Sequence, residues 1–87
     1  MKKEKLSIGT QCHLSDLVIG QKAKVLALHS DNKSLRRRLL DMGITSGVEI
    51  KIKKTAPLGD PVDIALRGYE LCIRIREMQN IDVEVIE

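Results

Sequence analysis

Aromatic side chains are almost absent from this sequence. Its 87 residues include Tyr69 but no Trp and no Phe, so a hydrophobic core has to be built from Val, Ile, Leu and Met. Proteins that bind single-stranded nucleic acid usually stack the bases on aromatic side chains, and proline-rich peptides dock in grooves lined by aromatic residues. The single tyrosine counts against a small basic barrel that binds RNA or DNA and against a binder of proline-rich peptides, although both stay open as alternatives.

Cysteine and long apolar runs are scarce as well. The charged start, Met1–Lys5, is followed by no apolar run long enough for a signal peptide or for a membrane span. We therefore expect a cytoplasmic protein in which the two cysteines, Cys12 and Cys72, are free thiols. The formal net charge of +3 permits an anionic partner without requiring one.

Motifs for catalysis, metal binding and nucleotide binding are missing. No Ser/His/Asp or Cys/His arrangement can be named, so we predict a protein that is not an enzyme and needs no cofactor. The possible transition-metal ligands are Cys12, His13, His29 and Cys72. Because they show no metal-binding spacing, we predict that they do not cluster and that no dedicated metal site exists. Residues 56–61 lack the lysine and the hydroxyl residue of a phosphate-binding loop.

Alternation of apolar and polar residues predicts about five short strands. A period of two is typical of a strand with one buried and one solvated face, and such runs cover residues 22–28, 48–53, 62–67, 69–76 and 81–85. Prolines and glycines separate the three middle runs, which predicts a β-meander. Laid flat, the strands would leave open edges, so we predict that they curl into a small barrel.

One short helix is predicted between the first and second strands. Leu35, Leu39 and Met42 are spaced by four and three residues, which places them on one helical face. Ser30, Asp31 and Asn32 are candidate N-caps, and Gly43 suits the helix end, so we expect the helix to run from about Ser34 to Met42 and to pack over one end of the barrel. We expect the core to be dominated by Leu35, Leu39, Val48, Ile50, Ile52, Val62, Ile64, Leu71 and Ile73.

The densest positive charge lies in this helix, at Arg36, Arg37 and Arg38. Successive helical residues point about 100° apart, so the three arginines cannot share one face. We expect at least one of them to pair with an acid such as Asp41, while the others reach solvent.

The other distinctive surface is a stiff, exposed loop between two strands, made of Pro57, Leu58, Gly59, Asp60 and Pro61. The prolines restrict the backbone and the glycine permits a positive φ. We expect a rigid turn in which Asp60 makes a local hydrogen bond.

Two stretches of the chain resemble the FeoA family, the small cytosolic proteins associated with bacterial ferrous iron uptake. The resemblance is carried by RRRLLDMGITSG at residues 36–47 and APLGDPVDIALRGYELCIR at residues 56–74, and it extends from about Leu14 to Val85. It implies an SH3-like barrel for residues 13–87. The segment before it, residues 1–12, begins with a basic stretch without periodicity, and we expect it to be a flexible tail. Two positions depart from the family pattern: Ser46 stands where proline is common and Met78 where alanine is common.

The resemblance also implies a function. It suggests a non-enzymatic role beside FeoB, the membrane ferrous iron transporter with a cytosolic GTPase domain. We expect the contact to use the helix arginines together with the loop at Pro57–Pro61. FeoA-like domains also occur at the C-terminus of metal-dependent repressors, but no helix-turn-helix precedes the domain in this sequence.

Overall fold

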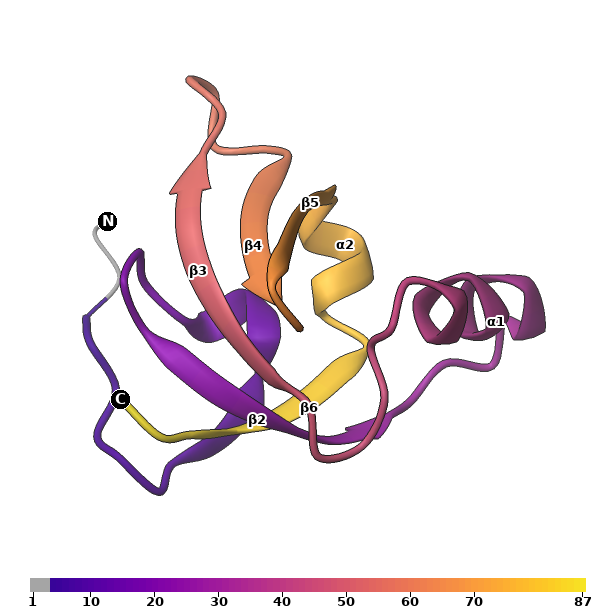
Figure 1. Ribbon diagram of the computed structural model, residues 1–87, viewed down its shortest axis with the longest axis horizontal. Coiled ribbons are helices and arrows are strands. Elements are labelled where there is room, and N and C mark those ends of the chain that lie inside the picture. Colours follow the sequence, from indigo (N-terminus) through magenta and orange to yellow (C-terminus); the bar gives the residue numbers. More distant parts are fainter. Residues whose placement is uncertain (1–3) are drawn as a thin grey trace.

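Six strands form one antiparallel sheet that curls into a small barrel (Figure 1). The computed structural model describes residues 4–87. The strands are β1 (Gln11–His13), β2 (Lys22–Leu28), β3 (Glu49–Thr55), β4 (Val62–Leu66), β5 (Tyr69–Ile73) and β6 (Ile81–Val85), and they lie in the order β1-β6-β2-β3-β4-β5. The helices are η1 (Leu14–Asp16), α1 (Lys33–Asp41) and α2 (Ile75–Met78). The predicted barrel is thus confirmed, with one strand more than expected.

The additional strand, β1, lies in the segment expected to be a flexible tail. Cys12 is paired with Val83 of β6, and the pairing continues toward the N-terminus, where Gly9 N donates to Val85 O at 2.7 Å. The end of the expected tail is therefore part of the sheet. Its first three residues lie outside the described range.

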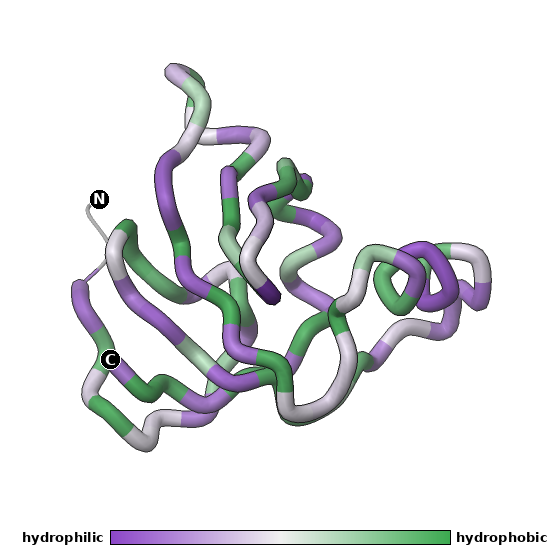
Figure 2. Tube along the Cα trace, in the orientation of Figure 1, coloured by the Kyte–Doolittle hydropathy of each residue, from purple (hydrophilic) through white to green (hydrophobic). Residues whose placement is uncertain are grey.

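Alternating burial along the strands produces an aliphatic core, and Figure 2 shows the same alternation of hydrophobic and hydrophilic residues along the chain. Of the predicted core, Leu39, Val48, Ile50, Ile52, Val62, Ile64 and Ile73 are buried. Leu35 and Leu71 are only half-buried, because one lies in the first turn of α1 and the other on the edge strand β5. The core also contains buried side chains beyond those expected to dominate it: Leu14, Leu17, Ala23, Val25, Ile44, Leu66, Met78, Ile81, Val83 and Val85.

A β-bulge in β2 explains why the alternation of that strand looked irregular. Val25 is paired with Val83 of β6, but the next pair is Ala27 with Asp82, so Leu26 is an extra residue. An inserted residue reverses the faces of all the residues that follow it. Ala27 is therefore exposed instead of buried, on the outer face of the sheet.

Helix α1 lies beside the barrel at the end where β2 finishes (Figure 1). Asn32 is the N-cap, with its Oδ1 accepting a hydrogen bond from Leu35 N at 3.1 Å, and Gly43 has a φ of 89° just after the last turn. The predicted bounds differ from the observed ones by one residue at each end. Leu39 is the buried residue of this helix, and the rest of α1 is largely available to solvent.

A buried amide joins the two ends of the domain. Gln21 is 1% exposed, and its Nε2 donates to Leu6 O at 3.0 Å and to Glu87 O at 3.4 Å. Its Oε1 accepts from Val18 N at 3.2 Å, so the buried polar group is satisfied. Among residues 4–87, no helix is long and apolar enough to cross a membrane.

Candidate functional site

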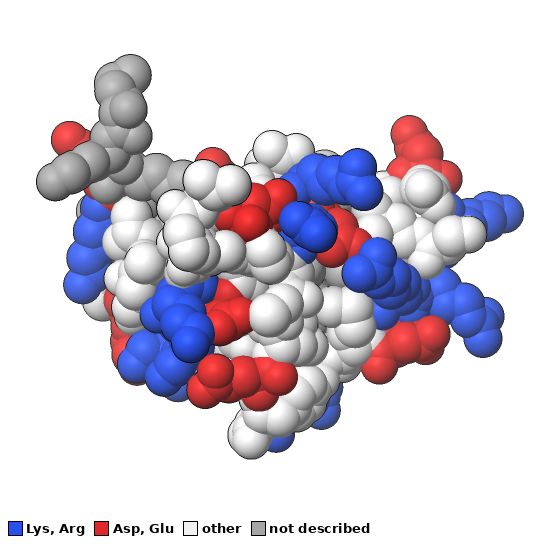
Figure 3. Space-filling model, turned by 90° about the horizontal axis from the view of Figure 1, so that it is seen from above, with Lys and Arg blue, Asp and Glu red and all other residues white. Residues whose placement is uncertain are grey.

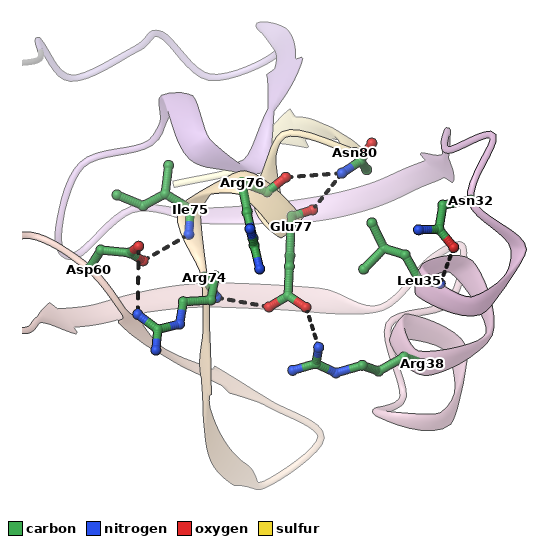
Figure 4. A network of polar contacts seen from close by, with 9 residues as sticks. All are labelled: Asn32, Leu35, Arg38, Asp60, Arg74, Ile75, Arg76, Glu77 and Asn80. Atoms are coloured by element: carbon green, nitrogen blue, oxygen red, sulfur yellow. Dashed lines mark hydrogen bonds and ion pairs between the residues drawn. The ribbon is translucent and has the colours of Figure 1, made fainter.

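The three arginines of α1 differ in their surroundings. Arg38 points toward α2, where its Nη1 lies 2.7 Å from Oε2 of Glu77 (Figure 4). Arg36 and Arg37 are exposed and make no ion pair within residues 4–87. The expectation that an arginine pairs with an acid is thus confirmed for Arg38, but the acid is Glu77 and not Asp41. The carboxylate of Glu77 is nearly buried and requires a counterion, whereas Asp41 is exposed to water.

Glu77 is the centre of the polar network shown in Figure 4. Its side chain is 6% exposed, and Oε1 accepts a hydrogen bond from Arg74 N at 3.0 Å while Oε2 receives Arg38. Asn80 closes the same turn, because its Nδ2 donates to Arg76 O at 3.0 Å. These contacts fix α2 at its N-terminus and join it to α1.

The loop between β3 and β4 is attached to α2 as well. Oδ1 of Asp60 accepts a hydrogen bond from Ile75 N at 2.9 Å, and Oδ2 lies 3.9 Å from Nη1 of Arg74 (Figure 4). The expected local bond of Asp60 is therefore wrong. The donor is instead the backbone N–H of Ile75, the first residue of α2, where no intrahelical partner is available.

The tip of this loop projects from the barrel. Ala56 N donates to Pro61 O at 2.9 Å and Gly59 N donates to Ala56 O at 2.7 Å, and Gly59 has a φ of 90°. Leu58, at the tip, is 97% exposed. An apolar side chain held in solvent by a hydrogen-bonded turn is the kind of group that a protein partner can cover.

The helix and the loop do not form one continuous patch. Figure 1 places them as two separate projections with α2 between them. A hollow of about 530 Å³ on the α1 side of α2 is lined by Leu35, Arg38 and Arg76 among others. A second hollow, of about 550 Å³, lies between η1, the loop and α2, and its lining is mainly apolar, including Val18, Ile19 and others. Of the predicted contact residues, Arg38 and Gly59 therefore border α2 from two sides.

Charge is mixed on the face that Figure 3 shows. Lys and Arg side chains stand out at the end of the molecule occupied by α1, with acidic side chains beside them. The single tyrosine, Tyr69, donates its hydroxyl hydrogen bond to Met42 O, and it lies next to Gly43.

The prediction that the possible metal ligands do not cluster is wrong for the two histidines. Nε2 of His13 and Nε2 of His29 each lie 3.5 Å from Oδ1 of Asp82. Sequence spacing could not show this, because the three residues come from β1, the end of β2, and β6. The order of the strands brings them together.

Both cysteines are free thiols, and neither belongs to a cluster of three possible metal ligands among residues 4–87. The thiol of Cys72 donates to Oδ1 of Asp63 at 2.7 Å, and this hydrogen bond raises the pKa of Cys72. Cys12 is half-buried against the core, and burial, with a smaller effect of Asp16, raises the pKa of its thiol.

Comparisons with known proteins agree with the geometry. The family model described as FeoA domain matches residues 12–85. A fusion of Fe(2+) transport protein A and the Fe(2+) transporter FeoB from Porphyromonas gingivalis is 33% identical over 73 residues, which are 84% of this chain and 8% of that protein. The chain thus spans a small part of this relative's length.

Solved structures are similar over most of the chain. The FeoA-like protein of Clostridium acetobutylicum has a TM-score of 0.81 and 39% identity, covering 94% of this chain and 92% of the other. The FeoA of Stenotrophomonas maltophilia complexed with zinc, described as an SH3 domain protein, has a TM-score of 0.73 and 25% identity, covering 83% and 88%. A manganese-dependent transcriptional repressor shares the fold at 12% identity, with a TM-score of 0.79 and coverage of 93% and 45%.

Proposed function

The chain belongs to the FeoA domain family, and on this premise we propose that it is a non-enzymatic, cytoplasmic accessory protein of ferrous iron transport that binds the cytosolic part of a FeoB-type transporter. The observation that carries the proposal is the relative from Porphyromonas gingivalis, in which the two components are named as one fusion protein. Two modules joined in one chain meet at a high effective concentration, so natural fusion favours partners that act together.

The surface of the molecule supports a docking role. The core is aliphatic, and the buried carboxylate of Glu77 is occupied by Arg38 and Arg74. The exposed groups Arg36, Arg37 and Leu58 remain available for contact. Arginine suits an interface because its planar guanidinium pairs with carboxylates and stacks in a desolvated setting.

Regulation of transcription and binding of nucleic acid have less support. The likeness to the manganese-dependent repressor is one of fold alone at 12% identity. Basic side chains are interspersed with acidic ones on the face in Figure 3, whereas a nucleic-acid-binding surface is usually a continuous basic one.

The test uses the double variant Arg36→Ala/Arg37→Ala and the purified cytosolic domain of the transporter. Binding measured by calorimetry should weaken at least about tenfold, and ferrous iron uptake by cells should fall, while the thermal melt stays unchanged. The matched control is Lys51→Ala/Lys53→Ala, which removes the same charge from exposed positions on β3. If both variants bind equally weakly, the effect is one of net charge alone. If the arginine variant binds normally, Arg36 and Arg37 of α1 are not part of the interface.

A further inference from the structure

We propose that His13, His29 and Asp82 form a binding site for a divalent transition-metal cation such as Zn²⁺ or Fe²⁺. These residues offer two imidazole nitrogens and one carboxylate oxygen, all within 4.8 Å of one another. The inference does not rest on the proposed function, since the cluster lies on β1, on β6 and just after the end of β2 and includes none of the residues assigned to the transporter contact.

Strand pairing builds the cluster around β6. His13 is directly opposite Asp82 in the pairing of β1 with β6. On the other side of β6, Ala27 is opposite Asp82, and the ladder ends with His29 N donating to Asn80 O at 2.8 Å. The carboxylate therefore lies between the two imidazoles, one at the end of β1 and the other just after β2.

The bulge at Leu26 is the element that makes this possible. Without an extra residue, Ala27 and His29 would continue the inward alternation of Ala23 and Val25. The bulge turns them to the outer face, where His29 becomes a diagonal neighbour of Asp82, at a separation that long side chains can span. Ala27, the residue paired with Asp82, carries only a methyl group and leaves room for the imidazole.

The distances fit a cation with little rearrangement. Both Nε2 atoms lie 3.5 Å from Oδ1 of Asp82. A tetrahedral ion with bonds of about 2.0–2.1 Å separates its ligand atoms by roughly 3.3–3.4 Å. The two nitrogen–oxygen distances are thus already close to those of a first coordination shell, and small side-chain rotations would complete it.

The chemistry of the donor set selects the class of ion. Imidazole nitrogens suit Zn²⁺, Fe²⁺ and their neighbours, whereas Mg²⁺ and Ca²⁺ prefer oxygen ligands. Three protein ligands leave at least one position for water or another ligand. Part of that space is a hollow of about 430 Å³ that His13 and Asp82 share with Asp16 and others. The side chains of His13, His29 and Asp82 are 47%, 54% and 34% exposed, so an ion can enter without opening the fold.

A simple ion pair does not account equally well for this arrangement. The sequence contains two histidines, and both approach the same carboxylate oxygen, with ring centroids 5.7 Å apart. One histidine is enough to pair with one carboxylate, so ion pairing alone gives the second histidine no role. A shared cation satisfies all three groups together.

The test is calorimetric titration of the tag-free 87-residue chain with Zn²⁺ and, without oxygen, with Fe²⁺, in a buffer near neutral pH. Absorption of bound Co²⁺ reports the ligand set independently. We expect one ion per chain, with affinity lowered at least about tenfold in Asp82→Asn and in His29→Gln. His29 is exposed, so His29→Gln should fold normally. Its ion affinity can therefore be measured even if Asp82→Asn affects folding.

The matched controls are Asp63→Asn and Cys72→Ser. Asp63 is another partly exposed strand aspartate and lies 3.7 Å from Nζ of Lys54, and Cys72 is a candidate metal ligand elsewhere in the sheet. Both variants should bind the ion as the unmodified protein does. The proposal is overturned if neither ion binds, if the His29 and Asp82 variants bind normally, or if binding is lost in Cys72→Ser and retained in Asp82→Asn.

Discussion

Replacing Arg38 by alanine should destabilise the domain, although Arg38 lies on the surface. The guanidinium lies 2.7 Å from the carboxylate of Glu77, and the side chains are 61% and 6% exposed, respectively. Without Arg38, the carboxylate stays nearly buried and keeps the hydrogen bond from Arg74 N. The substitution thus leaves the nearly buried carboxylate of Glu77 without its counterion, while its hydrogen bond to Arg74 N keeps it from reaching solvent.

The size of the effect follows from this asymmetry. Breaking a fully buried pair costs about 3–5 kcal/mol, whereas exposed pairs contribute about 0.2–1 kcal/mol. With one partner buried and the other exposed, we expect a loss of about 1–2 kcal/mol in the free energy of unfolding. For a domain of this size that is a fall of about 4–16 °C in the melting temperature.

Urea unfolding followed by circular dichroism measures this loss, and Arg36→Ala is the matched control because it shortens an exposed arginine of the same helix. The control should stay within about 0.5 kcal/mol of the unmodified protein. A double-mutant cycle of Arg38→Ala with Glu77→Gln should show coupling between the two residues. If Arg38→Ala were as neutral as Arg36→Ala, or if the cycle showed no coupling, the reasoning about the buried carboxylate would be refuted.

Two further predictions concern the core and a thiol. Ile50→Ala should lower the free energy of unfolding by about 2–5 kcal/mol, because Ile50 is fully buried; a silent substitution in urea unfolding would contradict the observed register. The hydrogen bond from Cys72 to Asp63 raises the pKa of the thiol, so less thiolate is present at a given pH and alkylation is slow. In a Cys12→Ser background, Asp63→Asn should accelerate alkylation of Cys72 at pH values below the thiol pKa, and an unchanged rate would show that the hydrogen bond has no effect.

The elements of the fold could largely be predicted because each leaves a local pattern. Alternation marks the strands, spacing of leucines marks α1, and Gly43 marks its end. Strand β1 could not be predicted in this way. It is three residues long, too short for a period of two to be recognised, and it exists because β6 offers an edge for pairing.

The contacts of the candidate sites were less predictable than the elements. Arg38 and Glu77 are far apart in the sequence, and only the position of α2 beside α1 makes them partners. The pattern in β2 did contain a signal, since its irregular alternation reflects the bulge at Leu26. Recognising a bulge from irregular alternation requires knowledge of the partner strand, which one sequence does not provide.

Within residues 4–87, the core of the small barrel leaves its interior without polar groups that could serve a partner or a cation. The buried polar side chains of the described residues, Gln21 and Glu77, already hold chain segments together, and the rest of the interior is aliphatic. The groups that we propose for a partner and for a cation therefore lie outside the core, as His29 does after β2 and Leu58 does between β3 and β4. Such a site has no motif, because strand register joins its members. Deleting Leu26, the extra residue of the bulge, should turn His29 inward and disrupt the proposed site of His13, His29 and Asp82 without replacing any of these three residues.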